Sequence, residues 1–310
     1  MSQEYKINEM TDVRRWISLA PGEFTLNDAA KFFCRGEYDN RANAMDLIMI
    51  LEGMVEYGEL ERSGNRRGYY RPPVSNLVKM EIEKADLDPE NIFMPFAIHK
   101  WVDLYPGNIV TIGGEKNSGK TGFFLNLAFD NLGRYKVHYF NSEMGASETK
   151  LRCVKYCESN RVGFSEWRKV NFYERSENFS DVIVPGKGNL NIIDFYEAHG
   201  EFYAMGEGIR KIHDNLDGAL AFIAIQKNPN SDLPLGGSRV TEKSRLHLTI
   251  SYNYGNSYPH KLRIDVGKNW AQEGQNPRGL YVNYRLGGGC FLKADSSLNP
   301  PHIWNREKAQ

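Results

Sequence analysis

The sequence predicts an α/β fold, in which a mostly parallel β-sheet is flanked by helices, ends in antiparallel strands and follows a small helical domain. Three observations carry this prediction. Between residues 92 and 245, near-continuous apolar runs alternate with amphipathic segments, which is typical of parallel strands covered on both faces by helices. Beyond residue 245 the apolar segments follow one another as hairpin-like strands. Residues 1–72 show helical spacing instead.

Residues 1–72 form the first predicted domain, with three helices and a hairpin. TDVRRWISLA and NRANAMDLIMILEGMVEYGEL carry apolar residues at helical spacing, and Thr25 provides an N-cap for the short helix between them, FTLNDAAKFF. The stretch GELERSGNRRGYYR alternates and turns at Ser63-Gly64-Asn65, which indicates a β-hairpin. Three helices closed by a hairpin resemble the winged helix-turn-helix family, in which the hairpin is the wing.

The chain then predicts a linker over residues 73–91 and a second domain over residues 92–310. The linker is polar, follows paired prolines and has room for a short helix. In the second domain a strand at Asn108–Ile112 comes first. Further strands are expected in KVHYFNSEM, NLNIIDFYE and ALAFIAIQKN, separated by helices in FFLNLAFDNL, GASETKLRCVKYC and GIRKIHDNL. The segments LHLTISY, HKLRIDVGKNW and GLYVNYRLGGGCFLKA complete the domain as antiparallel strands.

The composition narrows the class of protein. A formal net charge of zero, from 39 basic and 39 acidic residues, excludes a global electrostatic footprint for nucleic acid, so any such surface is local. No apolar run approaches the roughly 18 residues of a membrane span, and the N-terminus lacks the regions of a signal peptide. We therefore expect a cytoplasmic protein. Its four cysteines make neither a disulfide scaffold nor a metal site, and buried or idle thiols are expected.

A phosphate-binding loop dominates the second domain. The pattern Gly-x-x-x-x-Gly-Lys-Thr lies between an apolar strand and a helix, which is the context that a P-loop requires. In such a loop the backbone N–H groups surround phosphates, the lysine reaches the β- and γ-phosphates, and the threonine hydroxyl binds Mg²⁺. The sequence thus predicts ATP and Mg²⁺ as ligands. The predicted nucleotide-binding residues are Gly114, Glu115, Lys116, Asn117, Ser118, Gly119, Lys120, Thr121 and Gly122.

Two acidic residues follow strands at the places where nucleotide hydrolysis needs them. Asp194 comes near the end of the apolar strand NLNIIDF and is the predicted second Mg²⁺ ligand beside Thr121. Glu143 ends the strand VHYFNSEM, where a carboxylate could activate water. The alternative for Glu143 is an acid that stabilises the N-terminus of the next helix through the helix dipole.

The order of these motifs resembles a known family. YFNSEMGASETKLR is similar to the strand-Ser-x-Glu-Met pattern of DnaB-type replicative helicases, whose next helix bears an arginine, here Arg152. The chain from about residue 92 to 294 is identified as resembling RecA-like P-loop ATPases of the DnaB/RepA type. This resemblance implies a RecA-like fold, with Lys120 and Glu143 catalytic and Gln226 as the sensor of the γ-phosphate. The alternative for Gln226 is a polar residue that ends a strand.

The resemblance also concerns assembly. In this family a basic Lys-x-Arg segment of the C-terminal strands reaches the ATP site of a neighbouring subunit and neutralises charge in the transition state. Lys268 matches the first basic position and is implied to be catalytic. Trp270 stands where the second basic residue belongs, which leaves three alternatives. Either Lys268 acts alone, or Arg278 or Arg285 replaces the second residue, or the intersubunit site is weakened.

Two basic regions are candidates for DNA binding. The long loop KNPNSDLPLGGSRVTEKSRLHL occupies the position of the second DNA-binding loop of RecA-like proteins, with a plain solvated loop as the alternative. The predicted wing offers arginines between tyrosines. Residues 1–72 nevertheless carry ten Lys and Arg against twelve Asp and Glu, so protein docking stays an alternative for this domain. The predicted DNA-binding residues are Asn228, Gly236, Gly237, Arg239, Lys243 and Arg245 in the loop, and Arg62, Arg66, Arg67 and Arg71 in the wing.

The resemblance implies an ATP-dependent motor that acts on DNA. The leading hypothesis is a helicase that forms a homo-oligomeric ring, probably best described as hexameric, and translocates on single-stranded DNA in phage or plasmid replication, with duplex DNA as a candidate ligand of the winged helix. One alternative is a recombinase-like or helicase-loader ATPase that forms filaments or remodels partners. Another is an ATP-gated DNA-binding regulator, in which the nucleotide only switches the winged helix.

Overall fold

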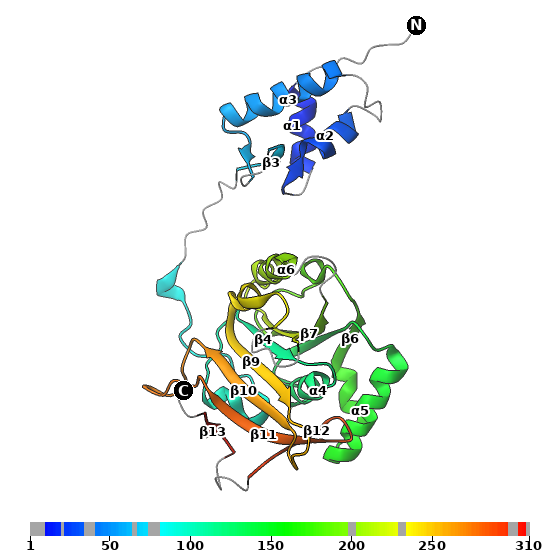
Figure 1. Cartoon of the computed structure of the whole chain (residues 1–310), viewed down its shortest axis with the longest axis vertical. Coiled ribbons are helices and arrows are strands. Elements are labelled where there is room, and N and C mark those ends of the chain that lie inside the picture. The colour runs from blue at the N-terminus through cyan, green and yellow to red at the C-terminus, as the bar shows by residue number, and fades with distance from the viewer. Residues whose placement is uncertain are drawn as a thin grey trace. The chain divides into compact units, whose positions relative to one another are not determined.

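The computed structural model describes residues 10–19, 22–33, 41–63, 67–73, 81–197, 203–228, 234–296 and 303–307 (Figure 1). The chain divides into two compact units, Met1–Ala85 and Asp86–Gln310. In the part of the chain that is described, no helix is long and apolar enough to cross a membrane. Cys153, Cys157 and Cys290 are free and buried, as expected. Cys34 lies outside the described residues.

The first unit combines three helices with a small antiparallel sheet. Its elements are α1 (Met10–Leu19), β1 (Phe24–Thr25), α2 (Leu26–Phe33), α3 (Arg41–Glu56), β2 (Glu61–Arg62) and β3 (Tyr69–Arg71). The strand order is β1-β3-β2, and the hairpin pairing of β2 with β3 is as the sequence predicts. The two-residue strand β1 was not predicted, since two residues give no periodicity. Most of the predicted turn, residues 64–66, lies outside the described residues.

Local capping and one shared core explain this small unit. The Thr25 hydroxyl accepts a hydrogen bond from the Asp28 N–H at 3.1 Å, and the Asp28 carboxylate accepts one from the Thr25 N–H at 3.0 Å, so the predicted N-cap is confirmed. Leu47, Leu51 and Met54 are spaced by four and three residues along α3, and all three are buried in the core of the unit. The helix therefore buries one stripe against the other elements.

The second unit contains a ten-stranded sheet and three α-helices. Its strands are β4 (Ile109–Gly114), β5 (Lys136–Asn141), β6 (Val170–Glu174), β7 (Asn189–Tyr196), β8 (Leu220–Gln226), β9 (Ser244–Tyr252), β10 (His260–Gly267), β11 (Leu280–Gly287), β12 (Phe291–Ala294) and β13 (Asn305–Arg306). Its α-helices are α4 (Lys120–Asp130), α5 (Ala146–Asn160) and α6 (Tyr203–Asp214). Short 3₁₀ helices cover Ile82–Lys84, Pro95–Lys100, Phe164–Lys169, Phe179–Asp181 and Gly237–Thr241 (η5), the first of them in the predicted linker.

The sheet confirms the predicted fold class. Its strand order is β12-β11-β10-β9-β4-β8-β7-β5-β6, and β13 pairs with β11. The strands β4 to β9 pair in parallel, whereas β10, β11 and β12 pair antiparallel at the C-terminal end. The edge strand β6 was missed, because its pattern in VNFYE buries only Val170 and carries no apolar run. The strand β13 was missed as well.

Helices cover both faces of this sheet (Figure 1). Along β8, Leu220, Phe222 and Ala224 belong to the core shared with α4 and α5, while the residues between them belong to a second core shared with α6. Successive side chains of a strand point to opposite faces, so a strand that is covered twice must be apolar at every position. This requirement explains the near-continuous apolar runs in the sequence.

Phe222→Ala is expected to destabilise the second unit by roughly 3–5 kcal/mol, the usual cost of removing a buried phenylalanine ring. Phe222 is fully buried in the central strand β8, where a cavity cannot readily collapse. Urea denaturation measures the change in the free energy of unfolding. Leu87→Ala is the control, since Leu87 is 83% exposed and its loss should cost less than about 0.5 kcal/mol. Equal effects of the two substitutions would contradict the packing described.

The parallel strands end at one edge of the sheet, here called the carboxyl edge. Gly114 at the end of β4 pairs with Gln226 at the end of β8. Asn141 at the end of β5 pairs with Asp194 of β7. The strand order therefore brings four segments that are far apart in the sequence to the same edge, where ligands bind in open α/β sheets.

Candidate functional site

A pocket of about 430 Å³ opens at the carboxyl edge. Seven of the nine predicted nucleotide-binding residues, Lys116 to Gly122, line this pocket, together with the predicted Glu143, Asp194 and Gln226. Gly114 and Glu115 lie just before them at the end of β4 and the start of the loop. The structure thus brings the sequence-predicted catalytic and cation-binding residues together, with the exception of Lys268. Met144, Glu148, Arg152, Phe195, Leu286 and Gly289 complete the lining.

The backbone of the P-loop explains its glycines. Gly119 has a φ of 98°, and α4 begins at the next residue. A Cβ atom on Gly119 would lie 2.4 Å from a Leu286 methyl group, and one on Gly114 would lie 2.5 Å from the Ser118 hydroxyl. A side chain at either position would therefore collide with its surroundings, and at Gly119 it would also strain the backbone. These two glycines let the loop turn tightly into the helix.

Lys120 is held by main-chain carbonyls at the base of the pocket. Its ammonium group donates hydrogen bonds to the carbonyl oxygens of Gly114, at 3.0 Å, and Glu115, at 2.8 Å. Burial lowers the pKa of Lys120, while the negative charges of Asp194, Glu143 and Glu115 act in the opposite direction. Three carboxylates thus favour the charged form of this lysine, which is the form that binds phosphate.

Asp194 and Thr121 form a pair of oxygen ligands suited to a hard cation. The Asp194 carboxylate is buried, accepts a hydrogen bond of 2.6 Å from the Tyr139 hydroxyl, and is also hydrogen bonded by the Thr121 side chain. Burial raises the pKa of Asp194, and these two hydrogen bonds, followed by the charge of Lys120, oppose that shift. A hydroxyl and a carboxylate in contact fit Mg²⁺, which takes one or two protein ligands in addition to phosphates.

Sequence reasoning missed Tyr139 as a partner of Asp194. The two residues are 55 positions apart, and a buried tyrosine in an apolar strand gives no signal of its own. Burial raises the pKa of Tyr139 well above its ordinary value, and the charge of Asp194 and the hydrogen bond to it add to this shift. The phenol therefore stays protonated and acts as a fixed donor that orients the carboxylate.

Glu143 lies in an exposed turn that Asn141 organises. The Asn141 side-chain oxygen accepts the N–H groups of Glu143, at 3.2 Å, and Met144, at 3.1 Å, while its amide nitrogen donates to the Thr149 hydroxyl at 3.1 Å. This turn links the end of β5 to α5 and directs Glu143 into the pocket lining. Asn141 was also missed. Its signal in the sequence is an asparagine two residues before the acid, which is the pattern of an Asx turn.

A glycine-rich hairpin closes one side of the pocket. Leu286 and Gly289, from β11 and the turn that leads to β12, line the pocket, and a Cβ atom on Gly122 would lie 2.9 Å from the Gly289 carbonyl oxygen. The Asn126 side chain of α4 donates a hydrogen bond of 2.7 Å to the Cys290 carbonyl. Gly122 and the hairpin therefore approach each other at backbone distance. The tract GGGC was read only as part of a strand, so its contact with α4 was not predicted.

The predicted DNA-binding loop is spread over the unit. Residues 229–233 lie outside the described residues. Asn228 is exposed, and Gly236 and Gly237 follow Leu235, whose N–H donates to the Gln226 carbonyl at the carboxyl edge. The helix η5, which contains the exposed Arg239, then contacts α6. Lys243 and Arg245 flank Ser244, which pairs with Ile109 at the opposite, amino edge of the sheet.

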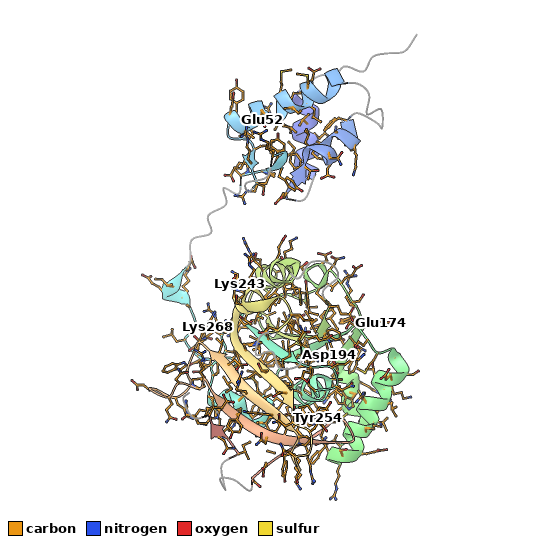
Figure 2. All side chains as sticks on the ribbon, in the orientation of Figure 1. Glu52, Glu174, Asp194, Lys243, Tyr254 and Lys268 are labelled. Atoms are coloured by element: carbon orange, nitrogen blue, oxygen red, sulfur yellow. The ribbon has the colours of Figure 1, made fainter. Side chains whose placement is uncertain are left out.

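Lys268 belongs to the same amino edge. Its N–H donates to the Arg245 carbonyl at 2.9 Å, and its ammonium group donates to the Glu242 carbonyl at 3.1 Å. Figure 2 shows Lys268 and Lys243 together at one end of β9 and β10, with Tyr254 at the other end. Partial burial lowers the pKa of Lys268, and the charges of Arg245 and Lys243 lower it further. These three cations form a cluster outside the chain's own pocket.

The position of the missing basic finger is also occupied. Trp270 donates its indole N–H to the Gly267 carbonyl at 2.9 Å and pairs with Val102 in an isolated bridge. Arg278 lies near the amino edge, since the Gly279 N–H donates to the Ile264 carbonyl. Arg285 lies toward the carboxyl edge, where its guanidinium is 5.8 Å from the ring centroid of Tyr258. Of these two arginines, only Arg278 shares an edge with Lys268.

The predicted wing is less basic than its arginines suggest. Arg62 forms an ion pair with Glu52, at 2.5 Å, and Arg71 forms one with Glu61, at 2.8 Å. Arg67 is exposed, and Arg66 lies outside the described residues. Because two of the three described arginines are already paired with carboxylates, their charge is partly neutralised before any ligand arrives.

Comparisons with known proteins complete the description of this site. No protein-family model matches the chain, and no curated protein matches it. The solved structures include three similar chains. The RadB recombinase has 15% sequence identity, covers 61% of this chain and 91% of its own, with a TM-score of 0.46. A KaiC-like protein from Pyrococcus horikoshii OT3 has 12% identity, covers 68% and 100%, with a TM-score of 0.49. An isolated ATPase domain has 17% identity, covers 69% and 95%, with a TM-score of 0.47. The strand order and the pocket above carry the assignment of the fold and the site.

Proposed function

We propose that this protein is a RecA-like ATPase. The observation that carries the proposal is the convergence of Lys120, Thr121, Asp194, Glu143 and Gln226, from four separate segments, on one pocket at the carboxyl edge. A P-loop alone indicates a bound triphosphate. A carboxylate on the next strand, an aspartate on the strand beyond it and a glutamine at the end of β8 indicate hydrolysis.

Each residue has a distinct role in the proposed reaction. Lys120 binds the β- and γ-phosphates, and the N–H groups of the P-loop surround them. Thr121 and Asp194 would hold Mg²⁺, which, when bound, neutralises charge on the phosphates. Glu143 orients the attacking water and accepts its proton. Gln226 contacts the γ-phosphate and changes position when that phosphate leaves.

We further propose that hydrolysis drives movement on single-stranded DNA within a homo-oligomeric ring, as in a phage or plasmid helicase. Gln226 leads directly into the chain that carries Asn228, Gly236 and Gly237, so a change at the γ-phosphate reaches candidate DNA contacts over a short path. The cluster of Lys243, Arg245 and Lys268 offers positive charge to the phosphates of DNA or to those of a neighbouring subunit.

The first unit has the element order and sheet order of a winged helix, which supports our proposal that it is one. Its ligand is open between DNA and protein. The paired arginines of β2 and β3 favour protein docking more than the sequence by itself does. DNA binding through Arg67 and the residues beside it is the competing hypothesis.

The ATPase rate with and without single-stranded DNA tests the motor proposal. We expect stimulation by single strands, and displacement of a strand from a partial duplex that depends on ATP. A chain that protects a defined duplex site, shows no stimulation and displaces no strand would be an ATP-gated regulator instead, and the motor proposal would be wrong.

The filament-forming or loader alternative has one observation in its favour. Trp270 occupies the place of a basic finger and is held by its own chain, which weakens the case for a closed catalytic ring. Electron microscopy of the protein with ATP and DNA distinguishes the two. Closed particles support the ring, and open helical filaments support the alternative.

A further inference from the structure

A buried ion pair lies directly behind the P-loop. The Lys227 ammonium group is 3.1 Å from the Glu115 carboxylate, and the side chain of Lys227 is only 4% exposed, against 21% for Glu115. Glu115 is the second residue of the P-loop pattern, and Lys227 immediately follows Gln226. Removing a lysine from water is costly unless a partner compensates its charge. This pair therefore needs a reason for its position.

Lys227 also holds the backbone of the same turn. Its N–H donates to the Gly114 carbonyl at 3.1 Å, and that carbonyl also accepts the bond from the Lys120 ammonium group. On its other side Lys227 forms an isolated bridge with Pro234. A single residue thus contacts both the main chain of Gly114 and the side chain of Glu115, the two residues whose carbonyls hold Lys120.

The charge of Glu115 is the chemical problem that this contact solves. A carboxylate beside a phosphate-binding loop repels a triphosphate and attracts Lys120, and the charge of Glu115 does act on Lys120 in the structure. At the short distances of a pocket and a low effective dielectric, one uncompensated charge weakens or strengthens binding appreciably. Lys227 compensates Glu115 from the side of the sheet, away from Lys120.

We propose that Lys227 is a positioning residue for triphosphate binding, which neutralises Glu115 and fixes the first turn of the P-loop so that Lys120 is free to bind phosphate. This inference rests on the proposed binding of ATP at the pocket. It assigns a role to a residue that contacts no substrate and that has no counterpart in the P-loop pattern.

Three variants of the full chain test it, with Mg²⁺–ATP binding measured by isothermal titration calorimetry. Lys227→Met keeps the length of the side chain and removes its charge, so Glu115 is left uncompensated, and we expect the Kd for ATP to rise about ten-fold or more. Glu115→Gln removes the repulsive charge and should bind ATP at least as tightly as the unaltered protein. The double variant should return to within about three-fold of the unaltered Kd, because the two changes are coupled through one contact.

The controls separate this role from simple structural support. If the double variant binds ATP as weakly as Lys227→Met, Lys227 only supports the fold and the proposal is wrong. Lys187→Met is the matched control, since Lys187 is also ion paired, with Asp86, but is exposed and lies outside the pocket. Thermal unfolding followed by circular dichroism checks that each variant is folded. An unaltered protein that binds no ATP would refute the proposed function, whereas an unaltered Kd in Lys227→Met would refute only this inference.

Discussion

Lys120→Ala is expected to reduce ATP hydrolysis by about three orders of magnitude, since groups that stabilise transition-state charge on phosphates commonly contribute this much. Lys120 is the cation at the base of the pocket, and its ammonium group donates only to main-chain carbonyls of the P-loop and lies among three carboxylates. Alanine removes the charge without leaving a buried carboxylate that depends on it alone, because Asp194 retains Tyr139 and Thr121. The measurement is steady-state phosphate release.

The matched control is Lys187→Ala, at an exposed lysine outside the pocket, which should hydrolyse ATP at the unaltered rate. The Lys120→Ala protein should also lose any ATP-dependent strand displacement. Hydrolysis or displacement that persists in folded Lys120→Ala protein would show that the pocket at the carboxyl edge is not the catalytic site.

Glu143→Gln is expected to lower kcat by about 10²–10⁴-fold, the usual contribution of a general base, with little change in the Kd for ATP. The substitution keeps the shape of the side chain and removes only its basicity. Glu143 is exposed at the pocket lining, and the turn that carries it is held by the side chain of Asn141, so the fold should not change. Single-turnover hydrolysis and calorimetric binding give the two quantities separately.

The same variant tests the competing interpretation of Glu143. A carboxylate that only stabilises the N-terminus of α5 through the helix dipole contributes up to about 1 kcal/mol to stability and nothing to kcat. A lower melting temperature with an unchanged kcat would therefore support the dipole role. Glu158→Gln, at an exposed acid near the other end of α5, serves as the control for general charge effects.

Local chemistry made much of this site predictable. The P-loop is contiguous, and its glycines, lysine and threonine each have a requirement that can be read from neighbouring residues. Asp194 and Glu143 could be placed because each follows an apolar run, and parallel strands end at the same edge of a sheet. The edge strand β6 carries no apolar run, since one of its faces is open, and for that reason it was missed.

The sequence by itself determined the class of fold, the phosphate-binding loop and the acids that follow the strands, because these features depend on periodicity and on residues close together in the chain. Only the tertiary structure decided which distant groups meet. Strand order pairs β4 with β8 and so places Lys227 against Glu115, 112 residues earlier. It also sets Tyr139 on Asp194, brings the glycine hairpin onto α4, and gathers Lys268 with Lys243 and Arg245. No local pattern encodes strand order, since it is selected by how the whole sheet buries its two faces.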